Sequence, residues 1–358
     1  AAAYADVVMP GYTHLQSAQP ISYGHYLSAV AQAMARDAGR IEQAIVNMDA
    51  SPLGAGALAG TAFPIQREET ARLLGFSGCV ENSLDAVASR DFAWELMSAM
   101  TIASLTWGRI AQDFYVWATP EFGLIEFPDS VAGTSSIMPQ KKNPVVVEYL
   151  KGKTSHLIGL LTAAMSAVKG THFTHSGDGN RESMRSFWES ADECLRCLVL
   201  FKLVIDSARP VEATMLHKAR TDFSTATDLA DALVRESDLS FREAHHVVGA
   251  VVRQALDAGL PASDITAEMV NAAATEQTGR PICLSEQSVR LCLDPAYSLE
   301  SRSAKGGPAP SLVVLRIAQQ RDELHKAQER AMRTRQMVAD SRTRLQCELT
   351  ELADLSAD

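Results

Sequence analysis

The stretch SYGHYLSAVAQAMARDAGRIEQAIVNM, residues 22 to 48, decides the fold class of this chain. Its small and apolar residues recur at intervals of three and four and no proline interrupts them, which predicts a single helix of about 27 residues. At a rise of about 1.5 Å per residue, this helix is roughly 40 Å long. A helix of this length is typical of an extended helical bundle.

Three further segments show the same pattern: Asp85 to Trp117, Pro144 to Lys169 and Arg181 to Ser207. Helices this long stay amphipathic or apolar over their whole length only by packing against each other. We therefore expect an all-α fold, an elongated helical bundle that other subunits help to complete. No segment carries an alternating pattern that predicts a strand.

The pattern shortens after Pro210, which predicts a change of domain. The spacing from Ser240 to Glu243 forms a capping box, and Gly259 is a signal for a helix C-terminus. We expect a central helical-bundle domain over residues 1–210, a small helical C-terminal domain over 211–330, and a helical or flexible tail over 331–358.

Composition and charge restrict the function. Hydrophobic residues make up 46% and charged residues 21%, as in soluble globular proteins. The formal net charge of -10 argues against a general nucleic-acid or acidic-membrane surface, because such partners are met by basic patches. Six scattered cysteines indicate a reducing compartment, and the sequence offers neither a signal-peptide pattern nor 18 uninterrupted apolar residues, so we expect a cytoplasmic protein.

The stretch GTSSIMPQKKNP, residues 133 to 144, combines hydroxyl, ammonium and amide groups. Asn143 is placed to cap a helix that has Pro144 in its first position, so the stretch is a loop that leads into a helix N-terminus. The free N–H groups there, with Lys141 and Lys142, favour an anion. Ser135 and its neighbour Ser136 are candidates for proton chemistry near a carboxylate. The alternative is an exposed basic turn whose serines only cap the backbone.

A second polar cluster lies in MPGYTHLQSAQP, residues 9 to 20, just before the first long helix. Thr13, His14, Gln16 and Gln19 are close together there between two prolines. A lone histidine is more often structural than catalytic, but this one lies on a polar loop in a chain that also has the lysine loop. His25, inside the helical stretch, is interpreted as structural.

These motifs resemble one enzyme family. MPGYTHLQSAQPI, SPLGAGALAGTAFPI, NSLDAVASRDF, EFGLIEFPD and GTSSIMPQKKNP are similar to the argininosuccinate lyase branch of the fumarase/aspartase superfamily. ATDLADALVRE, FREAHHVVGAVVRQAL and AKGGPAPSLV continue the resemblance, which covers Val8 to about Arg330. The QKKN form of the loop resembles argininosuccinate lyases and close relatives rather than fumarases and aspartases.

The resemblance implies an all-α homotetramer with active sites where three subunits meet. It implies a carbon–nitrogen lyase of amino-acid metabolism, which releases fumarate and an amine from an N-substituted aspartate by reversible β-elimination. The substrate is a small molecule, and neither a metal nor an organic cofactor is expected.

By position, the resemblance gives Ser135 the role of the base that removes the Cβ proton. Lys141 stabilises the aci-carboxylate that forms, and a preorganised cation suits this dianionic intermediate. His14, paired with Glu148, assists protonation of the departing nitrogen.

The same resemblance gives a substrate-binding set. Thr13 holds a succinyl carboxylate, and Asn143 assists Lys141. Gln16 and Ser136 belong to the same set, as do His175 and Asn180 further along the chain.

Two features depart from the family pattern. First, relatives carry a long N-terminal portion before the His14 segment, with a further active-site block, so we expect this chain to be a fragment, a processed product or one half of a split enzyme with a separate N-terminal chain as partner. Second, GTHFTHSGDGNRESMRSFWES, residues 170 to 190, has His175, Asn180 and Ser183 where argininosuccinate lyases have tyrosine, glutamine and lysine.

The second departure suggests a different amine. Loss of a cation and a shorter amide weaken recognition of arginine, because each unmatched polar group costs about 1 to 3 kcal/mol. We expect a lyase that keeps the fumarate half of its substrate and uses another amine. The alternatives are an argininosuccinate lyase that tolerates the change, and a non-catalytic structural homologue.

Overall fold

The computed structural model describes residues 1–355, which gather into two compact units. Unit 1 contains residues 1–31, 116–127 and 208–320. Unit 2 contains residues 32–115, 128–207 and the chain from 321 onward. The domain boundaries expected from the sequence stay a prediction, and the one at residue 330 falls inside an unbroken helix.

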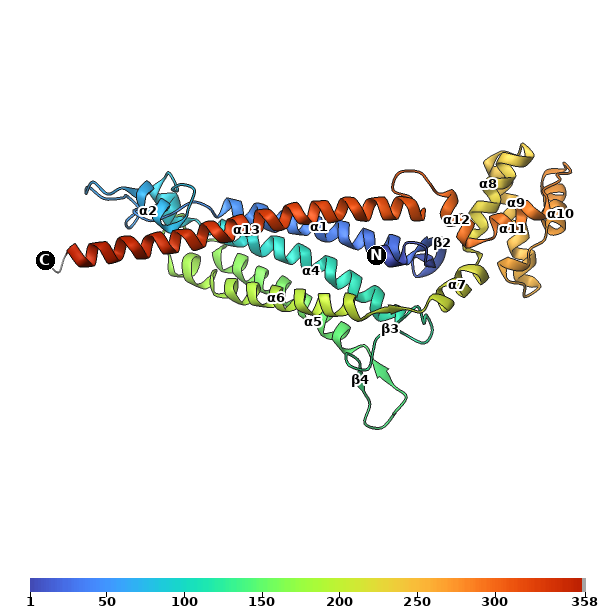
Figure 1. Ribbon diagram of the computed structural model, residues 1–358, viewed down its shortest axis with the longest axis horizontal. Coiled ribbons are helices and arrows are strands. Elements are labelled where there is room, and N and C mark those ends of the chain that lie inside the picture. The colour runs from blue at the N-terminus through green and yellow to red at the C-terminus, as the bar shows by residue number, and fades with distance from the viewer. Residues whose placement is uncertain (356–358) are drawn as a thin grey trace. The chain divides into compact units, whose positions relative to one another are not determined.

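Long helices dominate, as the sequence predicted (Figure 1). They are α1 (Tyr23–Asn47), α4 (Asp91–Trp117), α5 (Val145–Val168) and α6 (Arg185–Ser207). Within unit 2, α5 and α6 lie side by side, and their fully buried side chains include Leu150, Leu157 and Cys197. The α5–α6 pair is therefore a packed element that positions the chain segments before and after α5.

The predicted helix from Asp85 to Trp117 is broken near its start. A short helix, α3 (Ser83–Ala88), precedes α4, and Asn82 caps it by accepting hydrogen bonds from two backbone N–H groups. Ser89 is extended, with φ of -84° and ψ of 139°. The Arg90 guanidinium donates to the carbonyls of Val87 and Ser89, which compensates for the interrupted helical hydrogen bonds.

The predicted start of the fourth long helix at Arg181 is also corrected. One π-helical turn, Asp178–Glu182, precedes α6, which begins at Arg185. The Ser183 hydroxyl donates to the carbonyl of Gly179, and a Cβ at Gly179 would lie 2.9 Å from Ser176 Oγ. These local bonds favour the wider turn over a regular α-helix.

Unit 1 contains the shorter helices that were expected after Pro210. They are α7 (Glu212–Thr221), α8 (Ala226–Ser237), α9 (Phe241–Asp257), α10 (Ala267–Thr278), α11 (Glu286–Cys292) and α12 (Pro295–Ser301). Short 3₁₀ turns lie at Ala2–Tyr4, Phe223–Thr225 and Ala262–Asp264. The capping box of Ser240 and Glu243 is confirmed, and Gly259 follows α9 with φ of 68°. Helices α8 to α11 enclose one apolar core that includes Leu233, Val247 and Val270.

The expectation of no strands was wrong for residues 8–22. There β1 (Val8–Thr13) and β2 (Gln16–Ser22) form an antiparallel hairpin, with a bulge between Pro10 and Tyr12. The prolines hide the alternating pattern, because Pro10 and Pro20 lie opposite each other and neither has an N–H to donate. At the bulge a Cβ on Gly11 would lie 2.8 Å from the Gln19 carbonyl oxygen, so glycine is required.

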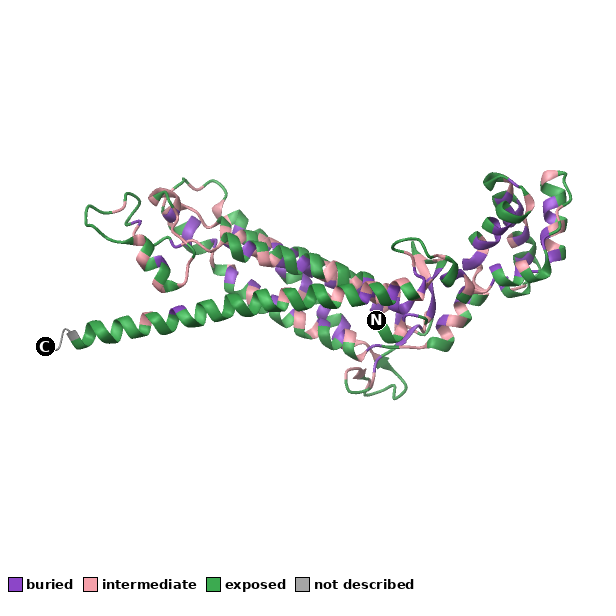
Figure 2. Cartoon of the chain, turned by 45° about the horizontal axis from the view of Figure 1, so that its top comes forward, coloured by how far each residue is buried: buried purple, intermediate pink, exposed green. Residues whose placement is uncertain are grey.

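Two shorter strand pairs and two helices complete the described chain. Strand β3 (Ile125–Glu126) pairs with β6 (Arg209–Pro210), and β4 (Gly133–Thr134) pairs with β5 (Lys142–Asn143). Helix α2 (Arg67–Leu74) lies in unit 2. Helix α13 (Pro310–Leu355) has 46 residues, and its C-terminal part is largely exposed (Figure 2). Among residues 1–355, none of the helices combines the length and the apolar character of a membrane span.

Candidate active site

The β1–β2 hairpin presents His14 at its tip. His14 and Leu15 form the two-residue turn with φ of 55° and 58°, and Thr13 pairs with Gln16 on either side. Positive φ at both positions defines a type I′ turn, which normally contains asparagine and glycine. Histidine and leucine in this conformation are strained, and such strain occurs most often at functional sites.

The body of the hairpin is anchored within unit 1. The Tyr12 ring lies 5.4 Å from the Phe122 ring, and Gln19 Nε2 donates to Thr227 Oγ1 over 3.3 Å. Burial, with a smaller contribution from the charge of Asp222, raises the pKa of Tyr12 to about 12. Tyr12 is therefore a neutral packing residue, and the exposed chemistry of the hairpin is at its tip.

The serine–lysine loop is closed at its base by the β4–β5 pair. Gly133 pairs with Asn143 and Thr134 with Lys142, which brings the two ends of the loop together at the start of α5. The predicted capping role of Asn143 is corrected, because Asn143 belongs to β5 and Pro144 occupies the cap position with no side-chain cap. The strand pairing uses the backbone of Asn143, so the helix begins one residue later than predicted.

Ser135 has an unusual hydrogen-bonding environment within this loop. Its Oγ accepts hydrogen bonds from the backbone N–H groups of Ile137, at 3.3 Å, and Met138, at 3.0 Å. Two N–H donors aimed at one hydroxyl oxygen favour negative charge on that oxygen. This is the arrangement that a serine needs if it is to accept a proton. The neighbouring Ser136 is exposed.

The two lysines of the loop differ in their surroundings. Lys142 Nζ lies 2.6 Å from Asp129 Oδ1, an ion pair that the motif does not predict because Asp129 lies outside it. The Lys141 side chain is exposed, and its backbone N–H closes a turn to the carbonyl of Met138. Glu148 lies exposed in the first turn of α5. The described contacts thus give Lys142 a structural partner and place Lys141 within the loop that carries Ser135.

The structure brings His175 and Asn180 into contact. Asn180 Nδ2 lies 2.8 Å from His175 Nδ1 and 3.4 Å from the Val87 carbonyl oxygen. Asn180 is 9% exposed, and its Oδ1 is buried with no hydrogen-bond partner among the described residues. When the Asn180 amide donates to Nδ1, the His175 imidazole carries its proton on Nε2 and offers an exposed N–H.

The predicted site residues fall into three groups. Ser135, Ser136, Lys141, Asn143 and Glu148 lie at the start of α5, whereas His175 and Asn180 follow its end. Because α5 has 24 residues, about 35 Å separates these two groups at 1.5 Å per residue. Thr13, His14 and Gln16 belong to unit 1. The expected pairing of His14 with Glu148 stays a prediction.

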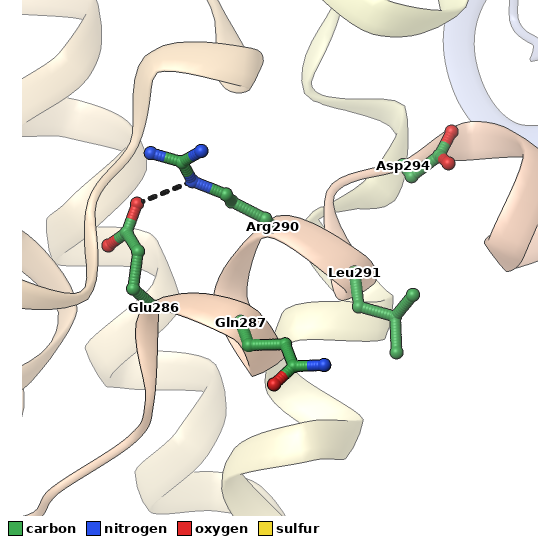
Figure 3. A pocket seen from close by; sticks show the side chains of 5 residues that line it. All are labelled: Glu286, Gln287, Arg290, Leu291 and Asp294. Carbon is green, nitrogen blue, oxygen red and sulfur yellow. Dashed lines mark hydrogen bonds and ion pairs between the residues drawn. The ribbon is translucent and has the colours of Figure 1, made fainter.

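Two other features are not catalytic candidates. Among residues 1–355 no group of three metal-ligating side chains occurs. Burial raises the pKa of the Cys194 and Cys197 thiols to about 11, so both stay protonated at neutral pH. A shallow hollow in unit 1 is lined by Glu286, Gln287, Arg290, Leu291 and Asp294 (Figure 3). Its Arg290 is already paired with Glu286 at 2.8 Å, one turn away on the same helix.

Comparisons with known proteins agree with this picture. Residues 1–159 match the family model described as Lyase, and residues 223–300 match the model described as Argininosuccinate lyase C-terminal. Argininosuccinate lyase 1 of Shouchella clausii is 42% identical over 88% of this chain and 64% of its own length. The chain therefore spans slightly less than two thirds of this curated relative.

Solved structures show the same fold. EDDS lyase in complex with formate superimposes with a TM-score of 0.92 and is 33% identical, over 98% of this chain and 70% of that one. A variant of EDDS lyase with bound fumarate matches equally well, with the same TM-score, identity and coverage. The fold is that of the fumarase/aspartase superfamily. The chain belongs to its lyase family, among homologues of argininosuccinate lyase.

Proposed function

We propose that this chain contributes the catalytic segments of a carbon–nitrogen lyase that splits an N-substituted aspartate into fumarate and an amine. The observation that supports this function best is the loop 133–143, which holds Ser135, Lys141 and Asn143 together at the start of α5. The argininosuccinate and EDDS lyases among its relatives, and the fumarate bound by a variant of the latter, favour the same class of reaction.

The first half of the reaction is removal of a proton from Cβ of the aspartyl group. A C–H bond next to a carboxylate is very weakly acidic, so the reaction needs a positioned base and groups that stabilise the developing charge. Ser135 first loses its own hydroxyl proton to solvent, and the two N–H groups that point at Oγ stabilise the resulting alkoxide. The alkoxide then takes the Cβ proton and becomes a neutral hydroxyl. Lys141 and Asn143 stabilise the aci-carboxylate.

The second half breaks the carbon–nitrogen bond. The electrons of the former C–H bond form the double bond of fumarate, and the C–N electrons leave with nitrogen. His14, oriented by Glu148, delivers a proton to that nitrogen and so releases the amine. Thr13, Gln16 and Ser136 bind the carboxylates of the substrate. No step in this scheme calls for a metal or an organic cofactor.

The site is proposed to form between copies of the chain. Within one chain the Ser135 loop and the His175 segment lie about 35 Å apart along α5, which is too far for one small substrate. A homotetramer in which different subunits contribute the loop, the hairpin tip and the His175 segment resolves this separation. A cytoplasmic setting fits the six scattered cysteines.

The amine released is proposed to differ from arginine. His175 offers a neutral N–H, Asn180 has a short amide fixed against Val87, and the Ser183 hydroxyl is buried and bonded to Gly179. None of these three side chains provides a fixed charge for an amino-acid carboxylate. A small neutral or differently charged amine suits this segment better than arginine.

The test is to incubate the purified protein with fumarate and a pool of amines that includes arginine, then to search by mass for an adduct one fumarate heavier than an input amine. We expect one adduct, made from an amine other than arginine. An adduct from arginine alone would instead identify argininosuccinate lyase activity. Absence of any adduct, with the cleavage of N-substituted aspartates also absent, would favour a non-catalytic homologue.

A further inference from the structure

Helix α13 carries an apolar seam with a period of seven residues. Its members are Ile317, Leu324, Ala331, Val338, Leu345 and Leu352. A strict seven-residue repeat over this length keeps one face of a helix against a partner helix through a left-handed supercoil. The seam therefore marks one apolar stripe along α13.

The start of the seam is buried, whereas Leu324 and Val338 further along it are 57% and 40% exposed. Ile317 is 8% exposed and packs in unit 1. In unit 2 the Arg330 guanidinium pairs with the carboxylate of Glu42 on α1. Further along, Ser341 is fully buried, and a Cβ placed at Gly75 would lie 2.7 Å from its Oγ. Within unit 2, α13 thus contacts the chain at Arg330 and Ser341, while the seam between Ile317 and Ser341 is exposed.

Beyond Ser341 the same face is exposed. Leu349 is 53% exposed and Leu352 is 62% exposed, while Leu345 between them and Ser341 is half-buried. Leu345, Leu349 and Leu352 are spaced by four and three residues, so they form one stripe on the helix. The last part of α13 is mainly exposed (Figure 2).

The charges beside this stripe are arranged in two blocks of opposite sign. Arg342 and Arg344 precede Leu345, whereas Glu348, Glu351 and Asp354 follow it. A second copy of the helix laid antiparallel places the acidic block of each copy beside the basic block of the other. When Leu345 is taken as position a of a heptad, Arg344 and Glu351 both fall at position g. Two g positions meet across an antiparallel helix pair. A parallel pair would place like charges together.

We propose that residues 342–354 of α13 form an antiparallel helix pair with a second copy of this chain, in which Leu345, Leu349 and Leu352 are buried and Arg344 pairs with Glu351 in both directions. This surface is separate from the proposed chemistry. It continues an apolar seam that is exposed over most of its length, and it uses a charge pattern that complements its own copy.

The experiment mixes two proteins that each carry one introduced cysteine. Both also carry Cys79→Ser, Cys283→Ser and Cys347→Ser, which remove the three thiols that are not buried, and one carries Arg344→Cys while the other carries Glu351→Cys. A short thiol cross-linker is added at micromolar protein, and dimers are counted on a denaturing gel. We expect roughly tenfold more dimer from the mixture than from either variant alone, because a docked pair has an effective concentration in the millimolar range.

A matched control uses the opposite face of the same helix. Thr343→Cys mixed with Thr350→Cys places exposed thiols at the same separation but away from the stripe. Leu352→Lys in the Arg344→Cys and Glu351→Cys proteins should return the yield to the level of this control, and the exposure of Leu352 means that folding survives. Equal yields from all pairs would mean random collision and would overturn the proposal, as would the absence of dimer from the first mixture.

Discussion

The two ends of α5 differ in how firmly the protein holds the side chains beside them. Before α5, the loop of Ser135 and Lys141 is exposed and is closed by a two-residue strand pair. After α5, Asn180 and Ser183 are buried and bonded to neighbouring backbone. The first end keeps the residues expected of its family, whereas the second departs from them. Under the proposed function, reaction chemistry resides at one end of the helix pair and choice of amine at the other.

The largest expected effect comes from Ser135→Ala at the first end. Loss of a positioned base should lower kcat by about 10²- to 10⁴-fold, the usual contribution of general base catalysis. Among the described residues the side chain bonds to the N–H groups of its own turn, so the thermal unfolding temperature should stay within a few degrees of wild type. Turnover close to that of wild type would remove Ser135 from the mechanism.

Next in size is the difference between the two lysines. Lys141→Ala should lower kcat by about 10²- to 10³-fold, the usual cost of removing one stabiliser of transition-state charge. Lys142→Ala is the matched control, since Lys142 is exposed and paired with Asp129, and it should change kcat only a few-fold. Steady-state rates on the same substrate measure both. Equal losses would show that the ion pair, rather than Lys141 alone, organises the loop.

A smaller effect is expected at the second end, where the variant is His175→Tyr combined with Asn180→Gln. These two substitutions restore residues of the argininosuccinate lyase pattern and should raise kcat/KM for argininosuccinate by at least about 5- to 100-fold, the gain from a single matched polar group worth about 1 to 3 kcal/mol. The rate with the preferred amine should fall. An unchanged ranking of amines would place amine selection outside this segment.

The smallest effect on chemistry is expected between the two ends, at Glu193. This carboxylate accepts hydrogen bonds from Lys153 Nζ at 3.1 Å and contacts His156 Nδ1 at 2.7 Å, which links α5 to α6. Burial alone would raise the pKa of Glu193, but the hydrogen bonds from His156 and Lys153 outweigh it and hold the pKa below its ordinary value.

Glu193→Gln should therefore destabilise the fold by about 1 to 3 kcal/mol at neutral pH, with kcat nearly unchanged. A lowered pKa gives stability that is complete above the ordinary glutamate range and is lost as the pH falls through the folded value. The difference in unfolding temperature between wild type and variant should shrink as the pH falls below about 4. A difference that is constant with pH would mean that packing, not charge, is lost.

The long helices were predictable because each has a periodic pattern that lasts for more than 20 residues. The errors lie where local bonds replace that pattern. The break before Asp91 depends on Asn82, which caps α3, and on Arg90, whose guanidinium donates to backbone carbonyls. Both contacts form only when the chain is folded. The hairpin of residues 8–22 was missed because paired prolines remove the N–H groups and the regular alternation by which strands are recognised.

The candidate site was only partly predictable. Ser135, Lys141 and His14 were singled out from motifs, but the ion pair of Lys142 with Asp129 and the fixed Asn180 amide depend on contacts that no local pattern encodes. The uncovered part of α13 was described from sequence only as a tail. Its seven-residue period could have been found by comparing positions one heptad apart from Ile317 onward.

The turn at His14 and Leu15 has a consequence for protein engineering. Asparagine and glycine would adopt the same backbone without strain, so a screen for heat resistance alone should recover Leu15→Gly or His14→Asn. If the hairpin tip takes part in the reaction, the first change should be tolerated and the second should abolish turnover. Comparing these two variants would then separate the energetic cost of the strained backbone from the catalytic role of the His14 side chain.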